Sequence, residues 1–490
     1  MAGKRIAIIG AGLGGLVAAI KLQQAGHTDI QLFDRNDKVG GTWAENQYPG
    51  SQCDVPILLY QLSFAPSFTW SRLFATAPEI QRYCEEITDR YRLRDRIHLS
   101  EPVTSARWND SSRTWTVQTS KGRLLEVDVV IGALGQLNRP QWPDINGRES
   151  FAGESMHSAR WNHNVDFTGK RVAVIGSAAS AVQIVPALAK TVAQLSVFQR
   201  SPNWLLPRND RPVPPEEMML MATDMAKALE LSDMMRRYIF DNADHFFWQA
   251  FQWTPAGRAA FTRISLNHLE AQVEDPALRQ QLTPNYPIGC KRVLFCDDYY
   301  PALQKPNVEL VTTAIDRIVP GGIVTADGRQ HDVDIIVYAT GFETTEWKWS
   351  VDIIGSDGRH LNQAWADAPE AYLGIGVAGF PNLFVMYGPN TNLGHNSITF
   401  MLECQGDYIV KALAALDTAG ARAMAPNQAA QDAFNARLQE QLNLTAWADP
   451  SAGNWYRNAR GRITQNWSSH ARDYAAATAD VNLGDYDLLP

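Results

Sequence analysis

Short apolar runs that end in glycine recur along the chain. Residues 4–10 read Lys-Arg-Ile-Ala-Ile-Ile-Gly, and residues 170–176 repeat this pattern as Lys-Arg-Val-Ala-Val-Ile-Gly. At the same offset Gly12 meets Ala178, and Gly15 meets Ala181. A buried strand that runs into a turn of small residues and then into a helix begins a βαβ unit, so the repeat predicts two copies of one such unit.

The same pattern predicts the next elements of each copy. In the first copy we expect a helix around Leu16 to Ala25 and a strand at Ile30–Phe33, which Asp34 follows. In the second copy the corresponding strand, at residues 195–199, is followed by Arg200. The two copies therefore share a pattern but differ in the charge that ends the second strand.

Two further apolar runs, residues 128–135 and 334–341, close the units. Each reads as a strand that ends in glycine, as expected where a strand of a nucleotide-binding fold meets its ligand. Their order predicts that the N-terminus begins the first unit, that a C-terminal segment completes it, and that the second unit is inserted between them. Pro140 and Pro143 precede that insertion, as in a linker.

Between residues 212 and 284 the pattern changes to a helical periodicity with almost no strand signal. An aromatic run at residues 246–248 lies here, and so does a group of methionines: Met218, Met219, Met221, Met225, Met234 and Met235. A helical insertion of this composition suits a soft apolar lid over a channel. Ordinary packing between helices is the alternative interpretation.

The first glycine turn, Gly10-x-Gly12-x-x-Gly15, predicts a dinucleotide site. The free N–H groups and the dipole of the following helix can hold a pyrophosphate, and Asp34 is placed to bind a ribose hydroxyl. The strand, the turn, the helix and the acidic residue of this copy all fit a dinucleotide-binding site. This copy therefore predicts an FAD site.

The second turn contains Gly176, Ser177 and Ser180, while Ala178 adds a methyl group where the backbone would approach the phosphates. Arg200 stands where the first copy has an aspartate, and a guanidinium suits a 2′-phosphate. This copy therefore predicts an NADP site. A surface arginine that merely ends a strand is the alternative.

We therefore expect an α/β protein with two Rossmann-like dinucleotide-binding domains and a helical insertion in the second. The expected bounds are residues 1–140 and 346–490 for the FAD-binding domain, 141–211 and 285–345 for the NADP-binding domain, and 212–284 for the insertion.

Composition excludes several other classes. The chain has 490 residues and a net charge of −8, and its charged residues form no long block of one sign, so nucleic acid is not an expected partner. No apolar run approaches the roughly 18 residues that span a bilayer, and the first strand begins too early for a signal peptide. The 5 cysteines include no C-x-x-C pair, which argues against a disulfide framework and a metal site. A cytoplasmic protein is expected.

Several motifs together resemble those of class B flavin monooxygenases, and among these the Baeyer–Villiger monooxygenases. In chain order they are Gly40-Gly41-Thr42-Trp43, Tyr48-Pro49-Gly50, Cys53-Asp54-Val55-Pro56, Phe151-x-Gly153-x-x-x-His157-x-x-x-Trp161 and Ala339-Thr340-Gly341-Phe342. In that family the tryptophan of the fourth motif is followed by proline or aspartate, whereas Asn162 follows it here.

The resemblance implies a reaction. In that family NADPH reduces FAD, the reduced flavin adds dioxygen, and the flavin peroxide attacks a ketone to give an ester or a lactone; such enzymes often oxidise sulfides as well. An arginine in a Lys-Arg pair supplies a fixed positive charge for the anionic species, a role that suits a preorganised guanidinium. Here the pair is Lys291-Arg292, ahead of Asp298-Tyr299-Tyr300. A surface Lys-Arg dipeptide is the alternative.

The resemblance also assigns further site residues. Asp54 would orient Arg292, with a turn-forming aspartate as the alternative. Lys291 and Ser201 would join Arg200 at the NADP phosphate and ribose. Gly41, Thr42 and Trp43 would lie at the flavin, although Trp43 could also be a core aromatic.

Two other motifs carry a weaker implication. His157 is expected to be a structural residue of the linker between the domains rather than a general base. The loop from Gly388 to His395 would lie beside the flavin, and a plain surface loop is the alternative.

Three rival functions use similar folds. Pyridine-nucleotide disulfide reductases need two cysteines beside the flavin, and after Gly41 the chain offers only Cys53 and then Cys84. An N- or S-hydroxylating flavin monooxygenase needs no arginine for an anionic adduct. A non-catalytic flavoprotein sensor that binds NADPH has no use for Lys291-Arg292 as an oxyanion-stabilising group.

Overall fold

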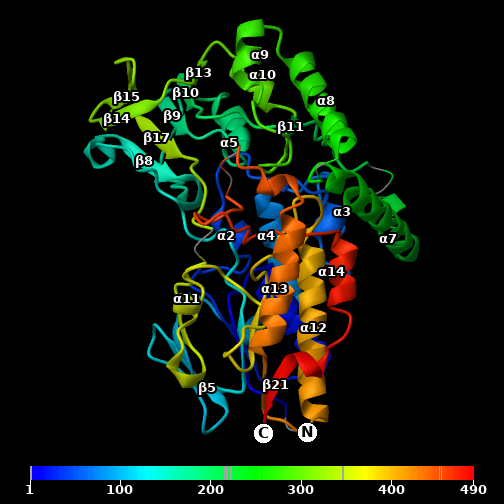
Figure 1. Ribbon diagram of the computed structural model, residues 1–490. Helices are drawn as coiled ribbons and strands as arrows, with labels where there is room; N and C mark the ends of the chain where they lie inside the picture. Colours follow the sequence, from blue (N-terminus) through cyan, green and yellow to red (C-terminus); the bar gives the residue numbers. More distant parts are fainter. Residues whose placement is uncertain are drawn as a thin grey trace.

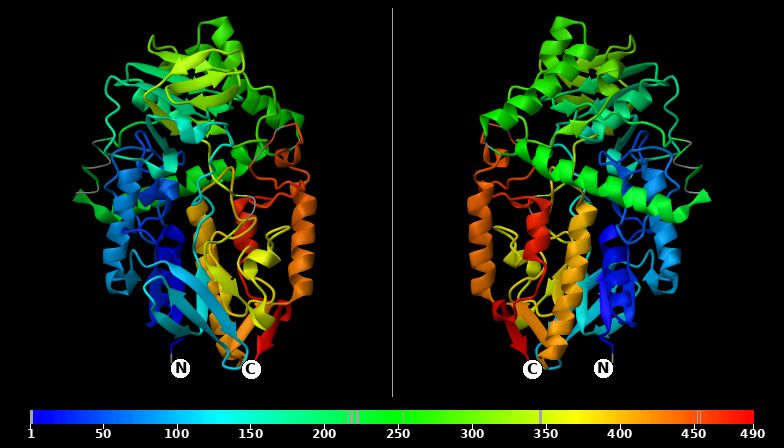
Figure 2. Two further views of the ribbon diagram at one scale, coloured as in Figure 1. Left: turned by 90° about the vertical axis from the view of Figure 1, so that its left-hand side faces the viewer. Right: turned by 90° about the vertical axis from the view of Figure 1, so that its right-hand side faces the viewer.

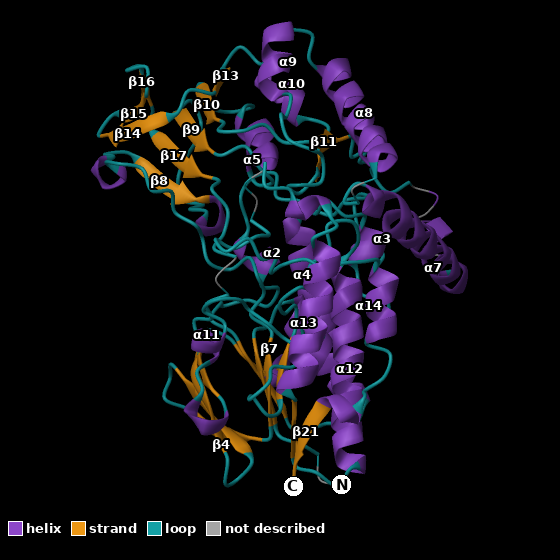
Figure 3. Ribbon diagram, viewed as in Figure 1, coloured by secondary structure: helices purple, strands orange, loops and turns teal. Residues whose placement is uncertain are grey.

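The computed structural model describes residues 3–214, 216, 219–220, 223–252, 254–344, 347–451, 453 and 455–490. These residues form two lobes, and both chain termini lie at the base of the lower one (Figures 1 and 2). Each lobe is built on a five-stranded parallel sheet, and Figure 3 shows the strands of the two lobes as separate layers.

The sheet of the lower lobe has the strand order β19-β7-β1-β2-β3. Its strands are β1 (Ile6–Ile9), β2 (Ile30–Phe33), β3 (Ile97–His98), β7 (Val129–Gly132) and β19 (Leu383–Val385). All four pairings are parallel. Because β19 pairs with β7, a strand from the C-terminal part of the chain completes the first sheet.

The sheet of the upper lobe has the order β13-β10-β9-β17-β8. Its strands are β8 (Glu154–His157), β9 (Arg171–Ile175), β10 (Gln194–Phe198), β13 (Val308–Val311) and β17 (Ile335–Tyr338). Here β8 takes the place of β19, and the remaining strands follow the order of the first sheet. The prediction of two Rossmann-like units is confirmed by this repeated arrangement.

An arginine–aspartate pair opens each unit in the same way. Arg5 Nη2 lies 2.8 Å from Asp128 Oδ1, and Arg171 Nη2 lies 2.7 Å from Asp334 Oδ1. The backbone N–H of each arginine also donates to its aspartate. The pair thus joins the start of the first strand of each unit to the strand beside it.

In each unit the first strand is followed by a glycine whose position does not accommodate a side chain. Gly10 has φ +112°, and a Cβ on it would lie 2.3 Å from the carbonyl oxygen of Ala133. Gly176 has φ +116° and would meet the carbonyl oxygen of Ala339 at 2.4 Å. A positive φ and a backbone contact this close both exclude a side chain.

The first helix, α1 (Leu13–Gln24), starts earlier than predicted, at Leu13 rather than around Leu16. Gly12 adopts an extended conformation and caps the helix, so the helix begins directly after the turn. In the second unit the equivalent helix, α5 (Ala181–Leu188), starts only at the position that corresponds to Gly15.

The two faces of the first sheet are covered by different layers. Ile6 and Ile8 of β1 pack towards α1 and α12 (Ile398–Thr418), while Ala7 and Ile9 pack towards a second sheet. That second sheet contains β4 (Val103–Asn109), β5 (Thr114–Thr119), β6 (Leu124–Val127) and β18 (Asp352–Ile354). The alternation along β1 is the period of two expected of a strand that is buried on both faces.

The remaining elements complete the layers or connect them. The other helices of the lower lobe are α2 (Thr42–Glu45), α3 (Ile57–Tyr60), α4 (Ala77–Arg90), α11 (Leu361–Ala364), α13 (Gln428–Leu442) and α14 (Ala471–Ala477). The other strands are β11 (Leu205–Leu206), β12 (Leu294–Phe295), β14 (Ile315–Val319), β15 (Gly322–Thr325), β16 (Gln330–Asp332), β20 (Ala423–Pro426) and β21 (Tyr486–Leu489).

The insertion is helical, as the sequence predicts. It contains α7 (Met225–Asn242), a π-helical turn at Ala243–Phe247, α8 (Pro255–Gln272) and α9 (Pro276–Leu282), and α10 (Tyr299–Leu303) follows. Its aromatic run packs against the C-terminal part of the chain, where Trp248 lies 5.1 Å from His395 and 6.0 Å from Trp447 between ring centroids. No helix in the described part of the chain is both long and apolar enough to cross a bilayer.

Some sequence predictions fall outside the described residues. They are the methionines at 218 and 221 and the domain boundary between residues 345 and 346. The domain bounds given above remain a proposal, which the strand order of the two parallel sheets supports.

We predict that Gly15→Ala and Gly14→Ala have opposite effects on stability. A Cβ on Gly15 would lie 1.9 Å from the carbonyl oxygen of Gly10, whereas a Cβ on Gly14 makes ordinary contacts of 3.4 Å and more. Gly15→Ala should lower the free energy of unfolding by about 2 kcal/mol or more, because the turn must move. Gly14→Ala should raise it by up to about 1 kcal/mol through helix propensity. Urea unfolding followed by circular dichroism measures both, and equal midpoints would contradict the prediction.

Candidate active site

An ion pair between Arg292 and Asp54 lies at the junction of the lobes. Arg292 Nη2 lies 2.7 Å from Asp54 Oδ1 and 2.8 Å from Oδ2, and Arg292 Nε lies 3.2 Å from Oδ2. The two residues are 238 positions apart in sequence. Asp54 stands in the loop before α3, and Arg292 stands between α9 and β12. The charge of Asp54 raises the pKa of Arg292 further above its ordinary value.

Both side chains of the pair are partly buried. The side chain of Arg292 is 29% exposed and that of Asp54 is 20% exposed. A guanidinium held by a carboxylate on one side can therefore offer its remaining N–H groups to a ligand on the other. The two predicted catalytic residues are thus brought together by the fold.

Two tyrosines that the sequence did not single out interact electrostatically with Arg292. Burial raises the pKa of Tyr387 and of Tyr456, whereas the positive charge of Arg292 partly lowers both pKa values again. Such an effect requires the phenols to lie close to the guanidinium. Tyr387 precedes the glycine-rich loop in the sequence and could have been found there, whereas no motif points to Tyr456.

The predicted flavin residues lie around the first turn. A Cβ on Gly41 would come within 3.0 Å of Gly12 Cα, and Gly41 has φ +55°, so the two glycines bring their backbones together. Trp43 Nε1 donates to Tyr60 Oη over 3.0 Å. Thr42 and Trp43 belong to α2, and Tyr60 ends α3, the helix that follows Asp54. The turn is therefore linked to the segment that carries Asp54.

Asp34 is buried at the mouth of the same turn. Its Oδ2 accepts from the N–H of Ala11 over 2.7 Å, and its Oδ1 accepts from the N–H of Asn36 over 2.8 Å. Burial raises the pKa of this carboxyl group. A bare glycine backbone, a helix N-terminus and a carboxylate at the strand end form a cradle that fits the ribose and pyrophosphate of a dinucleotide.

Three of the predicted NADP residues, Ser177, Ser201 and Lys291, contact one another, and Lys291 directly precedes Arg292 in the sequence. Lys291 Nζ donates to Ser201 Oγ over 3.1 Å, and Ser177 Oγ donates to the carbonyl oxygen of Ser201 over 3.0 Å. Burial and the neighbouring charge of Arg200 both lower the pKa of Lys291. Two cations that repel each other beside serine hydroxyls form a site that fits a phosphate group.

The segment Tyr48-Pro49-Gly50 contacts the second unit, a role that the motif alone did not reveal. Tyr48 Oη donates to Gln183 Oε1 of α5 over 3.0 Å. A Cβ on Gly50 would lie 2.5 Å from the carbonyl oxygen of Gln183. Ser180, at the N-terminus of α5, also interacts with the Tyr48 hydroxyl. This contact holds the two dinucleotide turns in one arrangement.

His157 has the surroundings of a structural residue. Its ring is fully buried, its Nδ1 accepts from the N–H of Ala159 over 3.1 Å, and the rings of Trp142 and Phe342 pack on it at 5.5 and 6.0 Å. Burial lowers the pKa of His157 to about 4. Further along the same motif, Trp161 stacks on Phe167 with ring centroids 5.1 Å apart.

The loop from Gly388 to His395 is almost wholly buried, so its interpretation as a plain surface loop is wrong. Tyr387 Oη donates to Asn392 Oδ1 over 2.7 Å, and Asn392 Nδ2 donates to Asn466 Oδ1 over 2.7 Å. Hydrogen bonds from both sides hold this loop close to Arg292 through Tyr387.

The cysteines do not suit disulfide chemistry. All 5 are free, and Cys53 and Cys84 are buried. Burial raises the pKa of Cys53 and brings that of Cys84 to about 12. Thiols that stay protonated are poor nucleophiles, so the disulfide-reductase interpretation has no support here.

Two matching parallel sheets, two glycine turns and a carboxylate-held arginine between them define the class of two-dinucleotide oxidoreductases. The family model described as Pyridine nucleotide-disulphide oxidoreductase matches residues 7–213. A "Baeyer-Villiger monooxygenase" of Streptomyces coelicolor is 40% identical over 486 residues, which cover 99% of this chain and 92% of that protein. The chain belongs to the Baeyer–Villiger monooxygenase family.

Solved structures agree with this assignment. The crystal structure of OTEMO in complex with FAD and NADP has a TM-score of 0.88 and 29% identity, with 99% of each chain covered. A cyclohexanone monooxygenase with bound ε-caprolactone has a TM-score of 0.86 and 30% identity, again with 99% of each chain covered.

We predict that His157 makes the protein less stable in acid. The pKa of about 4 in the folded protein lies below the ordinary 6.5, so the unfolded chain takes up the proton first. This contribution to stability is complete above pH 6.5 and is lost as the pH falls towards 4.

His157→Asn should remove this dependence while its Oδ1 still accepts from Ala159. Between about pH 7.5 and about pH 5, the wild type should lose about 2 kcal/mol more unfolding free energy than the variant. Urea unfolding at both pH values measures the difference. Parallel losses in the two proteins would contradict the prediction.

Proposed function

We propose that the protein is an FAD-dependent monooxygenase that consumes NADPH and dioxygen and inserts one oxygen atom next to the carbonyl of a ketone. The product is an ester or a lactone. The observation that carries this proposal is the Arg292–Asp54 pair between two dinucleotide turns. Membership of the Baeyer–Villiger monooxygenase family supports it.

The two cofactors have separate sites in this proposal. Gly10, Gly12, Gly15 and Asp34 hold the ribose and pyrophosphate of FAD, and Gly41, Thr42 and Trp43 lie beside its ring system. NADPH binds at Gly176, Ser177, Ser180, Arg200, Ser201 and Lys291. The OTEMO structure with both FAD and NADP supports this use of the fold.

Arg292 stabilises negative charge in the reaction. A flavin bound at the first turn would supply the oxygen-transfer chemistry. As oxygen is inserted, negative charge develops on the carbonyl oxygen of the ketone, and a permanently charged, preorganised guanidinium stabilises it without losing a proton. Asp54 orients that guanidinium and fixes its position.

The substrate of this proposal is a small ketone, with a sulfide as a further substrate. The ε-caprolactone in the cyclohexanone monooxygenase structure supports a compact cyclic ketone. We also propose a cytoplasmic location, which the 5 free thiols support because reducing compartments keep cysteines in this form.

The test of the function is NADPH consumption with and without a cyclic ketone, together with analysis of the product. The ketone should raise the rate and yield a lactone. If the ketone neither accelerates consumption nor gives a lactone, the ketone-oxidising function is wrong. Sulfide or amine oxidation alone would instead identify an N- or S-hydroxylating enzyme, and the absence of any product would identify a sensor.

We predict that Arg292→Ala lowers kcat for ketone oxidation by about 100-fold or more, because the developing anion loses its charged partner. Sulfide oxidation should continue, because it needs no anionic adduct. Arg237→Ala is the matched control, since Arg237 is an exposed arginine of α7. Product formation by gas chromatography measures each rate. Full ketone turnover by Arg292→Ala would exclude this role.

We predict that Arg200→Ala and Lys291→Met each raise KM for NADPH by about 10- to 100-fold, because each removes a charged partner of the 2′-phosphate. KM for NADH, which lacks that phosphate, should hardly change. Lys190→Met is the control, because Lys190 is exposed and follows α5. Steady-state kinetics with both nucleotides decide the point, and an unchanged NADPH-to-NADH preference would mark Arg200 as an ordinary surface arginine.

A further inference from the structure

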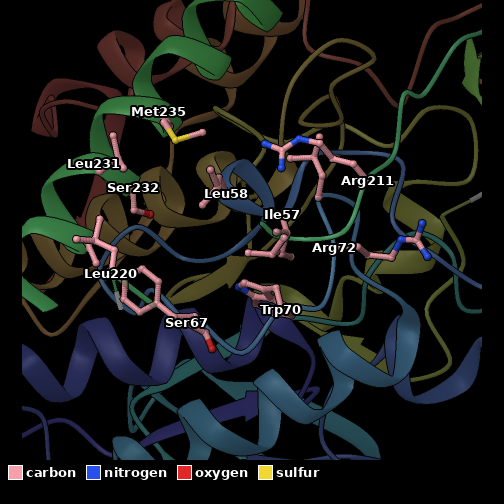
Figure 4. Close-up of a pocket in the computed structure, with 14 residues that line it drawn as sticks. Ile57, Leu58, Ser67, Trp70, Arg72, Arg211, Leu220, Leu231, Ser232 and Met235 are labelled. Carbon is pink, nitrogen blue, oxygen red and sulfur yellow. The ribbon is translucent and has the colours of Figure 1, made fainter. Parts of the chain in front are cut away.

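A cavity lies beneath helix α7 of the insertion. One wall comes from α7 and consists of Ala228, Leu231, Ser232 and Met235. The facing wall comes from α3 and the loop after it, with Ile57, Leu58 and Trp70. Figure 4 shows these two groups of side chains on opposite sides of the opening. The cavity therefore lies between the helical insertion and the lower lobe.

This cavity is large enough for a compact organic molecule. Its volume is about 60 Å³. One buried water needs roughly 10–15 Å³ by the same measure, so the space exceeds that of a few waters. Apolar walls do not hold several waters well, because water needs polar partners.

Four polar residues, Ser67, Arg72, Arg211 and Ser232, line the otherwise apolar cavity. Ser67 is hydrogen-bonded to Thr69, Arg72 pairs with Asp210 and Arg211 donates to the carbonyl oxygen of Pro212, which leaves Ser232. Its hydroxyl has no hydrogen-bond partner within the part of the chain that the structure describes. The indole N–H of Trp70, in contrast, already donates to Gln61 Oε1 over 3.1 Å. A hydroxyl donor at the edge of an apolar space suits a ligand with an apolar body and one acceptor oxygen.

The cavity is distinct from the candidate active site, because neither Arg292 nor Asp54 lines it. It is nevertheless close to that site along the chain. Ile57 and Leu58 belong to α3, which begins just after Asp54 and ends with Tyr60, the partner of Trp43. A molecule in the cavity would therefore contact the helix that connects both groups of site residues.

We propose that this cavity is a second binding site for a compact apolar carbonyl compound, a ring ketone or its lactone, which accepts a hydrogen bond from Ser232. The site goes beyond the proposed function and does not require turnover. A ketone that waits to react and a lactone that has just been released share the chemistry that the cavity would recognise.

The test uses the holoenzyme with oxidised FAD and NADP⁺, so that no reaction occurs. It is titrated with 4-(trifluoromethyl)cyclohexanone, with the corresponding lactone and with (trifluoromethyl)cyclohexane, and fluorine NMR counts the bound sites. Ala228→Phe fills the cavity. Ala226→Phe is the matched control, because Ala226 is exposed on the same helix.

The wild type and Ala226→Phe should bind one more molecule of ketone or lactone per chain than Ala228→Phe does. Binding of the ketone at this site identifies it as a substrate site, and binding of the lactone identifies it as a product site. If the ketone-oxidising function is wrong, no ketone binds at Arg292 in any of the proteins. The difference in the number of bound molecules between Ala226→Phe and Ala228→Phe then persists. Equal numbers of sites in Ala226→Phe and Ala228→Phe overturn the proposal.

Ser232→Ala provides a second test that leaves the volume and the fold unchanged. It should weaken carbonyl binding at this site by about fivefold, because one hydrogen bond is lost. Binding of (trifluoromethyl)cyclohexane, which has no acceptor, should not change. Unaltered carbonyl affinity in Ser232→Ala overturns the assignment of the ligand class.

Discussion

The ion pair of Arg292 with Asp54 joins the two lobes of this protein. In the proposed function Arg292 needs a fixed charge and a fixed orientation, and the carboxylate of Asp54 favours both. The partners come from different lobes and are 238 positions apart, so the pair exists only once both lobes are folded and in contact. The contact of Tyr48 and Gly50 with α5 supplies that arrangement.

Two copies of one unit lie on either side of this pair. Their strand orders match, and Gly10 and Gly176 make the same close approach to a neighbouring strand. The difference lies in the charge after the second strand, which is Asp34 in one copy and Arg200 in the other. A carboxylate suits ribose hydroxyls and a guanidinium suits a 2′-phosphate, so in the proposed function this change of sign assigns a different nucleotide to each unit.

The sequence predicted the strands of both units well, because a strand buried on both faces leaves an uninterrupted apolar run. It misplaced the start of α1, since Gly12 caps the helix through its backbone and leaves no side-chain signal. It also left the burial of the loop from Gly388 to His395 open. Polar residues such as Asn392 are typical of surface loops, and only their partners, here Asn466, show that they are satisfied inside the protein.

The sequence by itself determined the duplication, the two nucleotide turns and the chemical identity of the candidate residues. These depend on local patterns: a strand, a turn that tolerates only small residues, and a helix. The tertiary structure alone decided that Tyr387 and Tyr456 interact with the charge of Arg292 and that α7 covers a cavity against α3. Contacts of this kind join distant segments, and their geometry follows from the packing of whole lobes rather than from any local pattern.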